Sequence, residues 1–125
     1  RGDGLTPGEF LKRVKEKYPN IIIMADCATY EEAVAAYEAG ADLVGTTMNG
    51  YTPQTADQKG DPNFELVERL VKVLPCPVIA EGRVHTPEQA RKMLELGAWA
   101  VVVGGAITRP LEIAQRFMAA VADLH

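Results

Sequence analysis

The sequence predicts an α/β fold in which parallel strands alternate with helices, formed by a single domain over residues 1–125. Four short runs rich in β-branched apolar residues are typical of strands buried on both faces of a sheet. Segments with helical periodicity separate these runs, and another precedes the first of them. Two of the strand–helix units also resemble each other, which indicates an internal repeat.

The predicted elements follow one another regularly along the chain. The expected strands are 20–26 (NIIIMAD), 41–47 (ADLVGTT), 76–82 (CPVIAEG) and 98–105 (AWAVVVGG). The expected helices are 7–17, 31–39, 64–74, 87–96 and 111–121. The pattern is clearest in 64–74, where one helical face carries Phe64, Val67, Leu70, Val71 and Leu74. The chain therefore reads as a leading helix followed by four βα units.

Local signals mark where several helices begin and end. Capping boxes are predicted for the pairs Thr6 with Glu9, Thr29 with Glu32, and Thr86 with Gln89. Proline follows Thr6 and Thr86, at a position where the first helical turn accepts it. Gly40 and Gly97 each come just after a last helical turn, as C-terminal glycines do.

The internal repeat leaves two architectures open. Residues 29–44 (TYEEAVAAYEAGADLV) align with 86–101 (TPEQARKMLELGAWAV), and each segment follows a strand that ends in an acid, Asp26 or Glu81. Four βα units of about 30 residues could form half of an eightfold βα barrel, since a whole one needs about 250 residues. A small open doubly wound sheet fits the same pattern.

Composition excludes several classes of protein. The net charge of −4 is mild, and scattered lysines and arginines give no basic patch for nucleic acid. No apolar run approaches the roughly 20 residues that span a bilayer, and no signal-peptide pattern opens the chain, so we expect a cytoplasmic protein without a membrane partner. Cys27 and Cys76 are isolated from other metal-ligating residues, so neither a metal site nor a disulfide is expected.

In parallel α/β folds, the catalytic and ligand-binding residues lie at the carboxyl ends of the strands. The residues predicted to share this edge are Asp26, Thr46, Thr47, Glu81, Gly82, Arg83, Gly104 and Gly105. The glycines allow backbone amides to approach an anion closely, and arginine forms bidentate contacts with phosphate oxygens. Gly104, Gly105, Arg83 and Arg109 therefore suggest a phosphate site.

Simpler explanations exist for each of these residues. Glu81 could have the purely structural role of pairing with an arginine, and Asp26 that of anchoring its own loop. The two glycines at 104 and 105 could simply form a tight turn. His85 is interpreted as a loop residue rather than a base. Nothing near Cys27 predicts a lowered thiol pKa, so a nucleophilic role is not expected.

Two long segments carry a resemblance to a known family. They are IIIMADCATYEEAVAAYEAGADLVGTTMNGYTP and CPVIAEGRVHTPEQARKMLELGAWAVVVGGAITRP. Together they resemble the C-terminal half of N-acetylmannosamine-6-phosphate 2-epimerases, which interconvert N-acetylmannosamine 6-phosphate and N-acetylglucosamine 6-phosphate. The resemblance implies the (β/α)8 TIM-barrel class, with the four strands here equivalent to the fifth to eighth of the barrel.

The resemblance also implies roles for individual residues. Inversion at C2 of the open-chain sugar needs one group to remove a proton and another to return one to the opposite face. The family's AEGR glutamate is one of them and corresponds to Glu81, whereas the other, a lysine of the N-terminal half, has no counterpart in this chain. The substrate-binding residues implied are Asp26, Thr47, Tyr51, Gly82, Arg83, Gly104, Gly105 and Arg109. No metal ion or other cofactor is implied.

The chain departs from the family in two ways. ADCATYEE replaces the more usual ADISTxEE, so Cys27 and Ala28 are local variants. The absence of the N-terminal half leaves two strand edges unpaired, which predicts a homo-oligomer or association with a complementing half. The alternatives to an epimerase are another phosphosugar isomerase or lyase on the same scaffold, and an inactive half-barrel that binds phosphate.

Overall fold

The computed structural model describes residues 4–47 and 60–124. Its elements, in chain order, are α1 (Pro7–Lys17), β1 (Met24–Asp26), α2 (Tyr30–Glu38), β2 (Leu43–Gly45), α3 (Phe64–Val73), β3 (Val78–Glu81), α4 (Pro87–Glu95), β4 (Ala100–Val102), α5 (Gly105–Thr108), α6 (Pro110–Val121) and a final 3-10 turn, η1 (Ala122–Leu124). All four predicted strands and all five predicted helices are confirmed, with strands shorter than the apolar runs.

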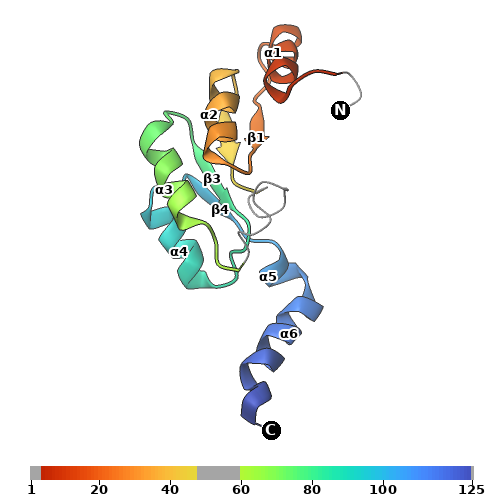
Figure 1. The fold of residues 1–125 in the computed structure, drawn as a ribbon, viewed down its shortest axis with the longest axis vertical. Coiled ribbons are helices and arrows are strands. Elements are labelled where there is room, and N and C mark those ends of the chain that lie inside the picture. The colour runs from red at the N-terminus through yellow and green to blue at the C-terminus, as the bar shows by residue number, and fades with distance from the viewer. Residues whose placement is uncertain (1–3, 48–59, 125) are drawn as a thin grey trace.

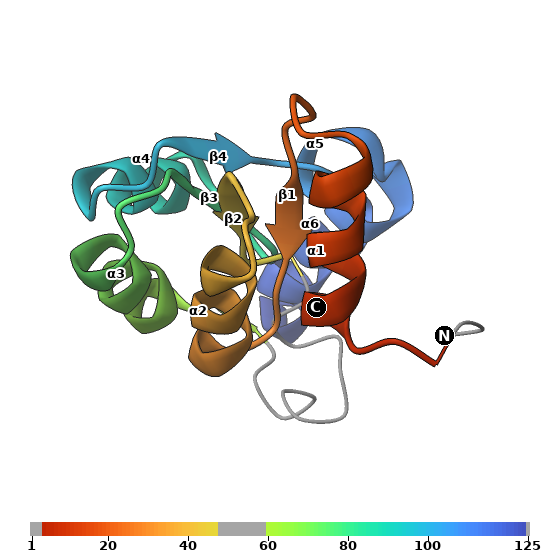
Figure 2. The same ribbon diagram turned by 90° about the horizontal axis from the view of Figure 1, so that it is seen from above.

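The four strands form one parallel sheet in the order β1-β2-β3-β4. Because right-handed crossovers that always step in the same direction place every helix on one face, α2, α3 and α4 share one side of the sheet (Figure 2). A doubly wound sheet would reverse direction at a switch point. The described strands show no such reversal, and their arrangement is that of one sector of a barrel.

The hydrophobic core lies between the sheet and these three helices. Val44, Val78 and Ala80 from the strands belong to the same buried cluster as Leu70 of α3 and Met93 of α4. Since side chains alternate along a strand, the intervening positions face the opposite, inner side of the sheet. The strand-end acids Asp26 and Glu81 are on that inner side.

Helix α1 is tied to the sheet by polar and apolar contacts. Nζ of Lys15 lies 2.6 Å from Oδ2 of Asp42, and the same oxygen accepts a hydrogen bond of 2.8 Å from the amide of Ile23. Leu11 is buried, and its side chain contacts the position where a Cβ of Gly40 would lie, at 3.5 Å. One carboxylate thus links α1, the segment before β1 and the start of β2.

Most of the predicted helix ends are confirmed. Thr6 and Thr86 form complete capping boxes with Glu9 and Gln89. Gly40 and Gly97 have φ of 113° and 104°, which only glycine adopts easily.

Of the two hydrogen bonds in the capping box predicted at the start of α2, one is confirmed and the other is wrong. Thr29 accepts a hydrogen bond from the amide of Glu32, but the Glu32 carboxylate accepts one of 2.8 Å from the amide of Ala28 instead of Thr29. Helix α3, for which no cap was predicted, begins at Asn63, whose Oδ1 accepts a hydrogen bond from the amide of Leu66.

Burial of every strand on both faces, as the sequence suggested, is also wrong. The outer strands β1 and β4 expose Met24 (39%) and Val102 (40%), so among the described residues the inner face of the sheet is not covered at these two positions.

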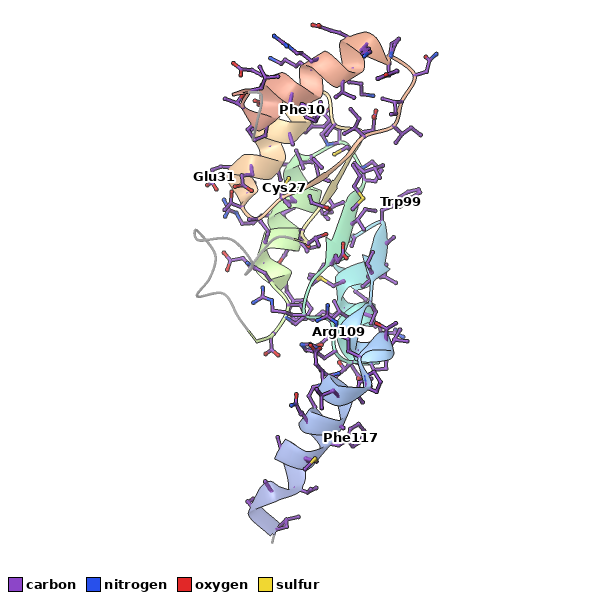
Figure 3. The ribbon with its side chains drawn as sticks, turned by 90° about the vertical axis from the view of Figure 1, so that its right-hand side faces the viewer. Phe10, Cys27, Glu31, Trp99, Arg109 and Phe117 are labelled. Atoms are coloured by element: carbon purple, nitrogen blue, oxygen red, sulfur yellow. The ribbon has the colours of Figure 1, made fainter. Side chains whose placement is uncertain are left out.

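Helix α6 projects away from the sheet (Figure 1), and Figure 3 shows Phe117 on this projecting segment. Its exposed apolar side chains include Leu111, Phe117 and Met118. The short helix α5, which connects β4 to α6, was not predicted, and its first residue, Gly105, had been assigned to the last strand. Among the described residues, no helix is both long and apolar enough to cross a membrane.

Candidate active site at the carboxyl ends of the strands

Asp26 and Glu81 are the last residues of β1 and β3. The register pairs Asp26 with Gly45 at the end of β2 and Glu81 with Val102 at the end of β4. Because the strands are parallel, these ends lie at one edge of the sheet. The sequence prediction that the two acids share an edge is therefore confirmed.

A single hydroxyl group connects the two acids. Thr47, two residues beyond β2, donates from Oγ1 to Oδ1 of Asp26 at 3.1 Å and also contacts Oε2 of Glu81 within hydrogen-bond distance. A hydroxyl carries only one proton, so it can donate fully to only one carboxylate at a time. The three side chains form one hydrogen-bonded group on the inner face of the sheet.

Gly45 provides the room for this group. A Cβ atom at position 45 would lie 3.1 Å from Oδ1 of Asp26, 3.6 Å from Oγ1 of Thr47 and 2.5 Å from Cε of Met24. Any side chain here would crowd the Asp26 carboxylate and the Thr47 hydroxyl. Gly45 was not among the residues predicted from the sequence, because its role depends on its place between β1 and β3.

Thr46 contacts the backbone of Glu81. Its Oγ1 accepts a hydrogen bond of 3.1 Å from the Glu81 amide and donates one of 3.0 Å to the Glu81 carbonyl oxygen. The side chain is only 4% exposed. Thr46 was predicted to lie at this edge, without a role, because the pattern of apolar residues contains no signal for this contact.

The chain turns sharply directly after Glu81. Gly82 has φ of 103° and Arg83 has φ of 60°. Left-handed backbone is unusual for a residue with a side chain and costs of order 1 kcal/mol. Arg83 therefore occupies an unfavourable conformation immediately beside the carboxylates, which no feature of the sequence indicated.

The two glycines predicted to contact phosphate lie at the start of α5. A Cβ on Gly104 would meet no atom within 4 Å, whereas one on Gly105 would be 3.3 Å from Cδ of Arg109 and 3.1 Å from Oε2 of Glu112. Arg109 donates from Nη1 to Oε1 of Glu112 at 3.1 Å, with both side chains largely exposed. The structure thus brings Arg109 against Gly105, but its guanidinium has an acidic partner.

Tyr51 lies outside the described residues. Cys27 is buried, and burial raises the pKa of its thiol to about 12, with smaller contributions from the negative charges of Glu32 and Asp26. A thiol with so high a pKa is not a nucleophile at neutral pH. Within 4–47 and 60–124, no cluster of three or more His, Cys, Asp or Glu residues could hold a metal ion.

Comparisons with known proteins agree with this geometry. A family model described as "Putative N-acetylmannosamine-6-phosphate epimerase" matches residues 2–123. Relatives carrying the name "Putative N-acetylmannosamine-6-phosphate 2-epimerase" include one from Caldanaerobacter subterraneus subsp. tengcongensis, 58% identical over 115 residues, which cover 92% of this chain and 48% of the relative. Another, from Cutibacterium acnes, is 51% identical over 115 residues, which cover 90% of this chain and 49% of the relative.

A solved structure of the N-acetylmannosamine-6-phosphate 2-epimerase from Clostridium perfringens is similar with a TM-score of 0.85 and 44% sequence identity. The similarity covers 96% of this chain and 51% of that chain. The chain spans about half the length of the curated relatives it matches, and that half is the C-terminal one. The predicted class is confirmed: the four βα units are half of a (β/α)8 barrel. By sequence and by fold, this chain belongs to the N-acetylmannosamine-6-phosphate epimerase family.

Proposed function

We propose that this chain supplies one proton-transfer group and the phosphate-binding end of an epimerase that interconverts N-acetylmannosamine 6-phosphate and N-acetylglucosamine 6-phosphate. The observation that carries the proposal is the group formed by Asp26, Thr47 and Glu81 at the carboxyl edge of the sheet. It offers a carboxylate held in place at the position where barrel enzymes carry out their chemistry.

Glu81 is the proposed catalytic residue. In the open-chain sugar, the hydrogen on C2 is acidic because it is α to the C1 carbonyl. Glu81 would exchange a proton with C2 on one face, while a second group exchanges one on the other face. If Glu81 removes the proton it ends protonated and the second group ends deprotonated, so both groups exchange protons with solvent before the next turnover in the same direction.

The other site residues are assigned to binding. Asp26 and Thr47 would contact the sugar hydroxyls, and Tyr51, outside the described residues, is also assigned to substrate binding. The phosphate would be bound by the amides of Gly82, Gly104 and Gly105 together with Arg83 and Arg109. Ion pairs between exposed side chains contribute little, so a phosphate can replace Glu112 as the partner of Arg109.

The exposed apolar surface supports the association of this chain with a partner. Both outer strands, β1 and β4, have an unpaired edge among the described strands, and α6 exposes Leu111, Phe117 and Met118. Such edges and faces favour pairing with another chain. We propose that a second copy or a complementing N-terminal half covers them; light scattering that gives a well-folded monomer at all concentrations would contradict this.

A second candidate is a phosphate-binding half-barrel without turnover. It rests on the family resemblance, which implies that the second proton-transfer group belongs to the N-terminal half, while this chain spans about half the length of the curated relatives it matches. Residues 1–125 would then act as one binding unit. In either case we place the protein in the cytoplasm, since ionised sugar phosphates do not cross membranes unaided.

The test is exchange of the C2 hydrogen of N-acetylmannosamine 6-phosphate in deuterated water, followed by proton NMR. The chain is compared with its Glu81→Gln variant and with Glu88→Gln, a control on the exposed first turn of α4. Exchange lost only in Glu81→Gln supports the assignment. Exchange that is equal in all three proteins contradicts it, and phosphate binding without exchange favours the second candidate.

A further inference from the structure

The two consecutive threonines after β2 contact Glu81 in different ways. Thr46 reaches its backbone and Thr47 reaches its carboxylate. We propose that Thr46 and Thr47 are a pair of positioning residues for Glu81, in which the first fixes the end of β3 and the second fixes the direction of the carboxylate. This inference rests on the proposed function of Glu81.

Thr46 extends the pairing of β2 with β3 beyond the last backbone pair. The last residue pair of the β2–β3 ladder is Gly45 with Ile79, and the amide of Thr46 still donates to the carbonyl of Ile79 at 3.2 Å. The Thr46 hydroxyl then serves both backbone groups of Glu81, accepting from its amide and donating to its carbonyl. One side chain thus replaces the next two backbone hydrogen bonds of the ladder.

This replacement matters because the backbone changes direction at the next residue. Gly82 and Arg83 both have positive φ, so the strand cannot continue past Glu81. A terminal strand residue without partners would fray, and its side chain would lose a defined direction. Thr46 is the single polar side chain found buried in the part of the chain that the structure describes, as expected for a hydroxyl whose bonds are all internal.

Thr47 restricts the side chain of Glu81 from the other end. Its hydroxyl contacts Glu81 at the end of β3 and also Asp26 at the end of β1, and these two strands lie on opposite sides of β2. The carboxylate is therefore held against β2 and oriented across the edge of the sheet. Because the Thr47 proton is occupied by carboxylates, a sugar hydroxyl can bind Thr47 only as a donor to its lone pairs.

The chain offers conservative replacements that separate a hydroxyl effect from a packing effect. Valine has the shape of threonine without the hydroxyl, whereas serine keeps the hydroxyl and loses the methyl. Thr6→Val serves as a matched control, because it removes the N-cap of α1 without touching Glu81. A change that follows the hydroxyl at positions 46 and 47, and not at position 6, indicates positioning.

The experiment is NMR on the isotope-labelled chain, without substrate. For Thr46→Val we expect the amide of Glu81 to exchange with solvent about tenfold faster, with the wild-type rate in Thr46→Ser. For Thr47→Val we expect the three-bond couplings about χ1 of Glu81 to change from one rotamer to averaged values, with recovery in Thr47→Ser. If Thr46→Val unfolds the chain, the Glu81 couplings in Thr47→Val test the inference by themselves. Thr47 is only half-buried, so its replacement should leave the chain folded.

The outcomes are separate from those of the proposed function. Unchanged couplings of Glu81 in Thr47→Val, or changes equal to those of Thr6→Val, would overturn the positioning inference even if C2 exchange depends on Glu81. Changed couplings with no effect of Glu81→Gln on C2 exchange would refute the proposed function and leave the positioning intact. If the chain exchanges the C2 hydrogen of the substrate, Thr47→Val should lower the rate of that C2 exchange about tenfold at saturating substrate, and Thr47→Ser should restore it.

Discussion

Gly45 lies so close to Asp26 that a Cβ atom at position 45 would be 3.1 Å from Oδ1 of the carboxylate. The same Cβ would be 2.5 Å from Cε of Met24, but that methyl ends a flexible side chain and can move. We therefore predict that Gly45→Ala displaces the Asp26 carboxylate from Thr47 and lowers the free energy of unfolding by about 1–3 kcal/mol. Urea unfolding and the NMR shifts of Thr47 measure the two effects.

Gly8→Ala is the matched control for this change. Its Cβ would lie 3.8 Å from Cβ of Ala39, an ordinary contact, and it would stand in the first turn of α1. Replacing a helical glycine that has room for a methyl group should raise stability by about 0.5–1 kcal/mol. Equal losses in the two variants would show that the effect at Gly45 is not steric.

A second glycine combines a backbone and a packing requirement. Gly97 has φ of 104°, and a Cβ there would be 2.6 Å from Cγ1 of Val71 in α3. Gly97→Ala should lower the free energy of unfolding by about 2 kcal/mol or more, because left-handed backbone and overpacking each contribute. In a double-mutant cycle with Val71→Ala, the double variant should recover the packing part only, and strictly additive effects would refute the steric explanation.

The elements of this fold could be predicted because their signals are local. Thr6, Thr86 and Gly97 mark helix ends within a few residues, and the strand-end acids follow directly from the apolar runs. The contacts of Thr46 with Glu81 span 35 positions and depend on the register of β2 against β3. No local pattern contains that register, nor the positive φ of Arg83, which the surrounding turn imposes.

The link between Lys15 and Asp42 predicts a response to acid. The hydrogen bond from Lys15 lowers the pKa of Asp42 below its usual value, with a further contribution from the amide of Ile23. A carboxyl group whose pKa is lower in the folded state adds stability above its unfolded pKa and loses it as the pH falls through the folded pKa. Thermal unfolding should therefore show a decline below about pH 4 that is smaller in Asp42→Asn.

Glu95→Gln provides the comparison for that titration. Glu95 also pairs with a cation, Arg91 at 2.7 Å, but both side chains are largely exposed within one helix. Its removal should leave the acid response almost unchanged, as is usual for exposed pairs. An acid response of Asp42→Asn that equals the wild-type one would show that the Lys15–Asp42 link does not hold α1 in place.

The two cysteines should differ in reactivity. Burial raises the pKa of both thiols, to about 12 for Cys27, and Cys27 is only 4% exposed while Cys76 is partly accessible. Only the thiolate reacts with iodoacetamide. At pH 8 the native chain should be alkylated slowly at Cys76 and hardly at all at Cys27, and both should react at similar rates in urea. Faster native labelling of Cys76→Ser than of Cys27→Ser would contradict the burial of Cys27.

The contact between Arg109 and Glu112 predicts how phosphate binding can be strengthened. Glu112 competes with any anion for the guanidinium, so Glu112→Gln should tighten the binding of inorganic phosphate about two- to fivefold. Arg109→Lys should weaken it, because an ammonium group cannot make a bidentate contact. Calorimetric titration with phosphate measures both changes, with Glu95→Gln as the control for removal of one acidic charge from another exposed pair.

Tightening by Glu95→Gln equal to that by Glu112→Gln would indicate only a general charge effect. Unaltered binding in Arg109→Lys would remove Arg109 from the phosphate site, since a guanidinium that contacts the anion cannot be replaced without loss.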